Sequence, residues 1–357
     1  MVANKICIQA LKTGPRASFL FVLVILFVTG CDETSQNSTK LSGSTMGTSY
    51  HITLANPVSD VAALQQQMDQ LLSAINLSMS TYIPDSEIIR FNHSPIGEPF
   101  PVSKDFCSVM TVAQQIFEQS RGAFDPTVGE LVALWGFGAD LVRETLPDAS
   151  QIKAALDKVG FEHIEVDCDS LKLIRNADVT VDLSAIAKGY GVDRVAEFLL
   201  EQGFNDFLVE IGGELRLSGQ NAQHQPWRIA IEQPSSLQRD IQQIVTLTNT
   251  GMATSGDYRN FFEYQGKHYS HTIDPATGNP VTHMLASVTV IHASATIADA
   301  LATAFMVLGV ESSLQWAESK DIPAYFQVKT SNGVDNVFEI RESSAFSQLL
   351  GTKESLR

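Results

Sequence analysis

Residues 164–175 read IEVDCDSLKLIR, and two short strand-like runs meet here across a polar turn. Apolar and polar residues alternate in each run, which is the two-residue period of a strand that buries one face. Strands joined by so short a connection pair antiparallel, because a parallel pair needs a crossover of about a dozen residues or more. The stretch therefore favours a sheet built from hairpins over a doubly wound parallel sheet.

Short strand-like runs continue on both sides of this hairpin. Further strand-like runs are SYHITL (49–54), EHIEVD (162–167), VTVDL (179–183), DFLVEIGGELRLSG (206–219), WRIAIEQ (227–233), QIVTLTN (243–249) and ASVTVIHA (286–293). Helical periodicity covers 58–77, 104–120, 128–135, 150–158, 186–202, 295–308 and 311–319. Because the helical stretches lie between groups of strands, we expect an α+β fold with mixed or antiparallel sheets and packed helices.

Residues 1–30 have the layout of a secretory signal peptide, with basic residues and no acidic ones ahead of an apolar run at 19–28. Ten apolar residues are too few to span a bilayer, which takes about 18. The following FVTGC resembles the bacterial lipobox, which predicts cleavage before Cys31 and its lipidation with acyl chains such as palmitate. The alternative is a generic signal peptidase site with Cys31 unmodified. Asp32 resembles the signal that keeps lipoproteins at the inner membrane of two-membrane bacteria.

The polar residues that follow Cys31 predict a flexible tether, so residues 31–45 are expected to link the lipid anchor to a folded domain at 46–357. This length suffices for one large domain or two intimately packed ones. The predicted location is the cell inner membrane, with the lipid-anchored domain on the periplasmic side.

The charge of the chain excludes some partners. The net charge is −16, and it becomes −19 without residues 1–30, which hold three basic residues and no acid. This balance argues against nucleic acid as a partner and against electrostatic docking on anionic lipid. Cys107 and Cys168 are free to form a disulfide in an oxidising compartment, but their spacing does not demand one, and no Cys/His cluster indicates zinc.

Residues 296–305, TIADALATAF, form an apolar helical stretch that carries Asp299 and Thr303 four residues apart. At 3.6 residues per turn these side chains lie on one face. One interpretation is that Asp299 is exposed and Thr303 bonds back to a carbonyl one turn earlier. The other is a site for a hard metal ion, because such ions take oxygen ligands.

A second candidate is TVDLSAIAKGYGVDRVAEFLL, residues 180–200, which predicts a strand, a short turn and an amphipathic helix. Free backbone amides at a helix N-terminus bind phosphate, and Lys188 adds a positive charge there. The spacing matches neither a Walker loop nor a dinucleotide fingerprint. A solvated lysine after a turn is the alternative.

Two more stretches carry chemistry. In SRGAFDPTVGELVALWGFG (120–138), Asp125 precedes a proline and either caps the helix at 128–135 or serves a binding site. In TSGDYRNFFEYQGKHYSHTIDPATGNPV (254–281), His271 is a candidate base near neutral pH. The alternative there is that Asp274 and Thr277 only build a turn and that His271 is an ordinary surface residue.

Taken together, these stretches resemble the ApbE-type FAD:protein FMN transferases, from Met46 to about residue 345. The matching segments, in the family's order, are MGTSYHITL (46–54), MSTYIPDSEIIRFN (79–92), GAFDPTVGELVALWGFG (122–138), VDLSAIAKGYGVDRV (181–195), VEIGGELRLSG (209–219), SGDYRNFF (255–262), HTIDPATGNPV (271–281) and ADALATAFMVLG (298–309). The resemblance implies a bilobal α+β domain that binds FAD in a cleft, with Mg²⁺ at the pyrophosphate.

The resemblance also implies roles for individual residues. It assigns FAD contacts to Met46, Tyr82, Ala123, Phe124, Asp125, Asp182, Lys188 and Ile273. It assigns Mg²⁺ to the backbone carbonyl of Ala185 and to the side chains of Asp299 and Thr303. Some relatives carry a further acid one residue before the threonine, where this chain has Ala302, so weaker metal binding without FAD is expected.

The implied reaction is Mg²⁺-dependent transfer of FMN from FAD to a threonine hydroxyl of a target protein, with release of AMP. Asp299 would act through the metal, and His271 is our candidate for the base. The expected acceptors are periplasm-facing subunits of membrane redox complexes. Two alternatives stay open: an Mg²⁺-dependent FAD pyrophosphatase that gives FMN and AMP, and a non-enzymatic periplasmic flavin-binding lipoprotein.

Overall fold

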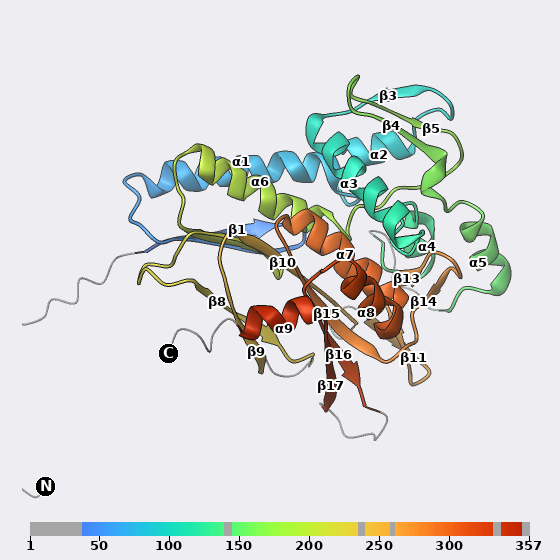
Figure 1. Cartoon of the computed structure of the whole chain (residues 1–357). Coiled ribbons are helices and arrows are strands. Elements are labelled where there is room, and N and C mark those ends of the chain that lie inside the picture. The colour runs from blue at the N-terminus through green and yellow to red at the C-terminus, as the bar shows by residue number, and fades with distance from the viewer. Residues whose placement is uncertain (1–37, 139–144, 235–239, 258–260, 331–336, 352–357) are drawn as a thin grey trace, which may run out of the picture. The chain divides into compact units, whose positions relative to one another are not determined.

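The computed structural model describes residues 38–138, 145–234, 240–257, 261–330 and 337–351 (Figure 1). The described residues all belong to one compact unit. The predicted signal peptide, Cys31 and its lipidation lie outside the described residues. In the part of the chain that the structure does describe, no helix is both long enough and apolar enough to cross a bilayer.

The central element is an eight-stranded sheet in which each neighbouring pair is antiparallel. Its strands, in spatial order, are β1 (Thr39–Thr45), β2 (Thr48–Leu54), β6 (Phe207–Ile211), β7 (Glu214–Ser218), β10 (Thr250–Gly256), β15 (Leu285–His292), β16 (Ala324–Lys329) and β17 (Phe338–Glu342). The antiparallel pairing and the packed helices confirm the predicted α+β class. The predicted hairpin at 164–175 is also present, as β4 (Ile164–Asp167) and β5 (Lys172–Arg175).

The predicted tether extends too far toward the domain. Its last residues form β1, which pairs along its whole length with β2. Leu41 is buried there against the core, so this polar-looking stretch still supplies an apolar contact. Composition alone therefore misplaced the start of the folded chain, because the strand gains its stability from pairing with a neighbour.

Helices α1 (Val61–Met79), α6 (Ala187–Glu201) and α7 (Ala295–Leu308) pack on one face of the sheet, as Figure 1 shows. On the other face, the ribbon of β8 (Trp227–Glu232) and β9 (Ile241–Leu247) and helix α9 (Ser344–Gly351) enclose a separate apolar cluster. Remaining helices are α2 (Glu87–Asn92), α3 (Lys104–Ser120), α4 (Gly129–Leu134), α5 (Ala149–Leu156), α8 (Val310–Ser319) and a 3₁₀ turn at Phe161–His163. Remaining strands are β3 (Pro99–Pro101), β11 (Phe261–Tyr264), β12 (Lys267–Ser270), β13 (Ile273–Asp274) and β14 (Asn279–Pro280).

Helix α7 is largely buried, and it begins and ends at the residues that the periodicity predicts, Ala295 and Leu308. It begins where the Ser294 side chain accepts a hydrogen bond from the Ile297 amide, and it ends at Gly309, whose φ of 73° suits glycine. Its first turn is close to its neighbours: a Cβ atom on Gly189 of α6 would lie 2.4 Å from the Ala295 carbonyl oxygen. A Cβ on Gly251 of β10 would lie 2.6 Å from the Ala295 nitrogen. The start of α7 is therefore held tightly between α6 and the sheet.

One predicted strand is wrong. VTVDL (179–183) is extended, but apart from one bridging pair, Val128 with Thr180, it has no strand partner in the described residues. Its backbone groups bond elsewhere: the Val181 amide donates to Asn92 Oδ1, and the Asp182 amide donates to the Pro126 carbonyl. The apolar pattern reflects burial of this segment, which any extended chain inside a core shares with a strand.

A disulfide joins Cys107 of α3 to Cys168 in the turn between β4 and β5. The spacing had left this pairing open. The bond fixes the small sheet of β3, β5 and β4 to the helix beneath it.

Candidate active site

A cavity of about 920 Å³ opens where the start of α6, the middle of α7 and the ends of several central strands meet. Most of the predicted site residues line it: Tyr82, Ala123, Phe124, Asp125, Asp182, Ala185, Lys188, His271, Ile273, Asp299 and Thr303. Met46 does not line the cavity; it packs between two apolar clusters, near Gly191 of α6. Segments far apart in sequence therefore converge on one hollow of a size that suits a dinucleotide.

Three charged side chains form the centre of this cavity. Lys188 Nζ lies 3.4 Å from Glu214 Oε1 and 3.8 Å from Asp299 Oδ2. Both carboxylates are almost fully buried, with 3% of each residue exposed. Lys188 is therefore a paired cation, and the interpretation of a solvated lysine after a turn is wrong.

The burial of these groups shifts their protonation. Burial is the largest influence on Glu214 and raises its pKa to about 8, against the lowering effect of Lys188 and with a further rise from Asp299. Burial also raises the pKa of Asp299, while Lys188 and the Gly189 amide oppose the rise. The pKa of Lys188 lies above its ordinary value, because the two carboxylates outweigh the effect of burial. The shared burial of two carboxyl groups beside one lysine therefore favours the protonated form of Glu214 at neutral pH.

The strip on α7 faces this cavity. Asp299 is buried and accepts a hydrogen bond from the Gly189 amide at 3.0 Å, so the interpretation that it is exposed is wrong. Thr303 Oγ1 lies 3.4 Å from Ser255 Oγ on β10. Ala185 lines the same cavity in the turn before α6.

The donor set fits magnesium. In the described residues no cluster of three or more His, Cys, Asp or Glu side chains forms an all-protein metal cage. Magnesium does not require one, since it binds through one or two carboxylates and fills its other positions with phosphate oxygens and water. Asp299, Thr303 and the Ala185 carbonyl offer oxygen atoms alone, and Glu214 Oε2 is a buried oxygen without a hydrogen-bond partner. These residues could hold Mg²⁺ together with a bound pyrophosphate.

Asp125 does not cap the predicted helix. The N-cap of α4 is Val128, which makes no side-chain cap bond. The Asp125 carboxylate instead accepts hydrogen bonds from the amide and hydroxyl of Thr127 and from the amide of Phe161. Burial raises its pKa, although the bonds from Thr127 act against the rise. Asp125 therefore shapes the loop that brings Phe124 to the cavity wall.

The loop before β13 supplies His271, which lines the cavity and lies beside Phe137, with 6.2 Å between the ring centroids and 70° between the ring planes. Asp274 and Thr277 do build a turn, as one interpretation held: the Asp274 carboxylate accepts from the Ala276 amide and the Thr277 hydroxyl. The turn directs the adjoining residues inward, so His271 is not an ordinary surface residue. The turn interpretation is thus correct for Asp274 and Thr277, and the role of His271 as a base stays a prediction.

A profile of the ApbE family matches residues 46–326, most of the chain. The chain belongs to the ApbE family. It is similar to the curated FAD:protein FMN transferases of Vibrio cholerae, with 43% identity over 91% of this chain and 96% of that protein, and of Haemophilus influenzae, with 41% identity over 88% and 92%.

Solved ApbE structures resemble the fold. The flavin transferase ApbE from Vibrio cholerae superposes with a TM-score of 0.80 at 42% identity, covering 87% of this chain and 99% of that one. The apo form of the Pseudomonas stutzeri flavinyl transferase ApbE gives a TM-score of 0.79 at 38% identity, covering 88% and 97%. The mixed α+β architecture with its antiparallel sheet is therefore that of ApbE flavin transferases.

Glu214 is the site residue of this ApbE chain that the sequence did not reveal. It follows the Gly212–Gly213 turn between β6 and β7, in a segment that the sequence marked as strand-like and as a family match without a role for Glu214. Strand alternation places Glu214 and Arg216 on one face and Leu215 on the other. The available signal was a pair of charged residues at alternate positions of a central strand, directly after a Gly-Gly turn.

Proposed function

We propose that this chain transfers the FMN part of FAD to the hydroxyl group of a threonine on another protein, with Mg²⁺ bound, and releases AMP. The enzyme class follows from relatives named FAD:protein FMN transferase that are up to 43% identical over most of the chain. The observation that carries the finer proposal is the cavity in which Lys188, Asp299 and Thr303 meet. A cation, a carboxylate and a hydroxyl at that spacing suit a pyrophosphate with its metal.

The threonine oxygen forms a bond to the phosphorus of the FMN half, and the bond from that phosphorus to the bridging oxygen breaks. AMP leaves with the bridging oxygen, and a base takes the hydroxyl proton. Mg²⁺, when bound, neutralises the pyrophosphate and polarises the phosphorus under attack.

The residues of this chain have distinct parts in that step. Asp299, Thr303 and the Ala185 carbonyl hold the metal, and Lys188 balances charge on the leaving side. The exposed ring of Tyr82 and the buried ring of Phe124 lie at the cavity wall, where planar ligand rings pack. Asp182 and Ile273 line the same wall and complete the FAD contacts.

His271 is our candidate for the base. It is half-buried, lines the cavity and comes from a loop fixed by the Asp274 turn, which holds the ring at the site without burying it. Histidine is the side chain that most often serves as a general base. In the transfer assay described below, a His271→Asn variant should bind FAD normally but label the acceptor slowly; an unchanged rate would remove His271 from this role.

Two other functions use parts of the same site. An FAD pyrophosphatase would place water where the threonine hydroxyl attacks, with the same metal ligands. A protein that only stores flavin has no need of an oxygen strip on α7 beside the pyrophosphate position, so the placement of Asp299 and Thr303 at the cavity argues against storage.

Incubation of residues 38–357 with FAD, Mg²⁺ and a peptide that carries the family's threonine motif, Ser/Thr-Gly-Ala-Thr, tests the proposal. We expect the peptide to gain the mass of one FMN less water, and AMP to appear in equal amount. A peptide with valine in place of the acceptor threonine is the control. Equal amounts of free FMN and AMP with an unlabelled peptide would instead establish the pyrophosphatase.

We further propose that acyl chains on Cys31 anchor the domain to the periplasmic face of the inner membrane, where its acceptors are exposed subunits of membrane redox complexes. The prediction is that Cys31→Ser leaves an active domain that no longer sediments with membranes, because stable attachment needs acyl chains and the described residues offer no spanning helix. Cys7→Ser, within the predicted signal, is the matched control. Retention of the Cys31→Ser protein in salt-washed membranes would contradict the anchor.

A further inference from the structure

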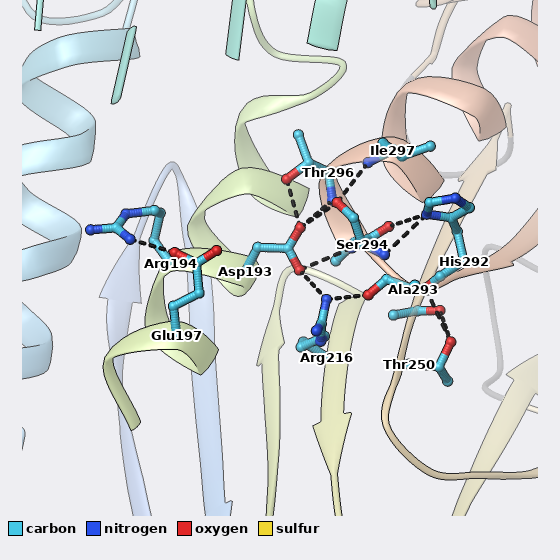
Figure 2. A network of polar contacts seen from close by, with 12 residues as sticks. Asp193, Arg194, Glu197, Arg216, Thr250, His292, Ala293, Ser294, Thr296 and Ile297 are labelled. Atoms are coloured by element: carbon cyan, nitrogen blue, oxygen red, sulfur yellow. Dashed lines mark hydrogen bonds and ion pairs between the residues drawn. The ribbon is translucent and has the colours of Figure 1, made fainter. Parts of the chain in front are cut away.

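Asp193 is a buried carboxylate of α6 that the reaction does not use directly. Both of its oxygens bind the start of α7, as Figure 2 shows. Oδ1 accepts from the Ala295 amide at 3.0 Å, and Oδ2 accepts from the Thr296 amide at 2.9 Å and the Thr296 hydroxyl at 2.7 Å. Oδ2 also accepts from the Ser294 hydroxyl at 2.6 Å. One side chain on α6 thus satisfies the first two free amides of another helix.

The next two backbone amides at the N-terminus of α7 also have hydrogen-bond acceptors. The Ile297 amide donates to Ser294 Oγ, and the Ala298 amide donates to the Ser294 carbonyl as the first bond of the helix. A carboxylate at this position is further stabilised by the partial positive charge of a helix N-terminus. The Ser294 side chain satisfies the Ile297 amide alone, so the bonds from Asp193 to the two preceding amides also fix where the helix starts.

Arg216 of β7 connects Asp193 and the residue before α7 to the sheet. Its guanidinium donates to Asp193 Oδ1 at 3.0 Å and to the Ala293 carbonyl (Figure 2). Asp193 therefore ties together the three elements that carry the charged centre of the cavity. Lys188 lies on α6, Glu214 on β7 and Asp299 on α7.

We propose that Asp193 is a positioning residue for the metal site: it sets the height and rotation of α7 against α6, and so places Asp299 and Thr303. The proposal rests on the proposed function, since it concerns the same metal. The tight contact of Gly189 with Ala295 and the bond from the Gly189 amide to Asp299 leave α7 little freedom to shift without moving the carboxylate. Magnesium demands short, near-ideal octahedral contacts, so a small shift of α7 weakens it more than it weakens ring contacts elsewhere in the cavity.

Two variants at this position separate positioning from simple capping. Asp193→Asn removes the charge and presents an amide to groups that all donate. Asp193→Glu keeps the charge and the capacity to cap but adds a methylene group between α6 and α7. A positioning role predicts that both variants lose metal affinity, whereas a capping role predicts that Asp193→Glu behaves like the wild type. Thr296→Val, which removes a single bond to Asp193, decides the question if Asp193→Asn does not fold.

The readout is binding of Mn²⁺ in the presence of FAD, followed by the electron paramagnetic resonance of the free ion, together with the melting temperature. We expect the Mn²⁺ dissociation constant to rise about tenfold, the lower end of what loss of an outer partner of a metal ligand costs. FAD affinity without metal should stay within about twofold, since the other cavity walls do not depend on α7. Asp60→Ala is the matched control: it removes the side-chain cap of α1, which contributes no residue to the cavity, and should lower the melting temperature alone.

Unchanged Mn²⁺ binding in folded Asp193→Glu would overturn the positioning role, whether or not Asp193→Asn loses affinity. The same result in Thr296→Val would do so if the asparagine variant fails to fold. Absence of Mn²⁺ binding in the wild type would instead contradict the metal assignment of the proposed function and remove the basis of this inference with it.

Discussion

Asp299→Ala is expected to abolish FMN transfer, by roughly a thousandfold or more, while the protein stays folded. The carboxylate is the only charged side chain of α7 that lines the cavity, and a metal at a phosphoryl group contributes several kcal/mol to the transition state. Alanine has the best helix propensity, and Lys188 keeps Glu214 as a partner, so the melting temperature should change little. The measurements are FMN transfer over a range of Mg²⁺ concentrations and the melting temperature of each variant.

Thr303→Val is the graded comparison for that experiment, because it removes the hydroxyl and keeps the shape. A neutral ligand can be replaced by water, so this variant should recover much of its activity at high Mg²⁺. Full transfer by Asp299→Ala at ordinary Mg²⁺ would contradict the metal site. Loss of activity in strict proportion to loss of melting temperature would indicate a structural role for both residues.

Lys188→Met is expected to change two affinities in opposite directions. FAD should bind more weakly, because the pyrophosphate loses a cation. Mn²⁺ should bind more tightly in the absence of FAD, because Lys188 lies 3.8 Å from Asp299 and 3.4 Å from Glu214 and competes with the metal for them. A unit charge at such a distance is worth about 4 kcal/mol at the effective dielectric constant of a protein surface, so an effect of about tenfold each way is conservative. Titration calorimetry with FAD and with Mn²⁺, in separate experiments, measures both.

Lys153→Met is the matched control for this variant. Lys153 is an exposed lysine paired with Asp157 at 3.0 Å, outside the cavity, and its loss makes the same change in net charge. Both affinities should stay at the wild-type values. Weaker Mn²⁺ binding in Lys188→Met would show that Lys188 supports the metal and does not compete with it.

The sequence predicted a helix or strand well where residues within that segment or next to it set its bounds. Helix α7 occupies the predicted residues 295–308, because Ser294, the apolar period and Gly309 all mark the same bounds. The sequence misplaced two segments. The polar composition of residues 39–45 hid their pairing with the adjoining strand β2, and the apolar pattern of residues 179–183 reflects burial without a strand partner beyond one bridging pair in the described residues.

The site was predicted mainly through resemblance to a family. Residue types alone left Lys188, Asp125 and His271 balanced between chemical and structural roles. The role of Glu214 depends on Lys188 lying beside it, and the role of Asp193 depends on α7 starting beside α6. Both contacts join residues that are distant in sequence, so the spacing of residues along the chain does not reveal them.

The disulfide between Cys107 and Cys168 has a consequence for the cavity. It closes a loop over a sequence separation of 61, and that loop contains Ala123, Phe124 and Asp125 of the cavity wall. On the chain-entropy model, a loop of this length restricts the unfolded chain by about 4 kcal/mol. Under reducing conditions that restriction is absent, so the cavity wall around Phe124 has its full stability only where the surroundings keep the disulfide oxidised.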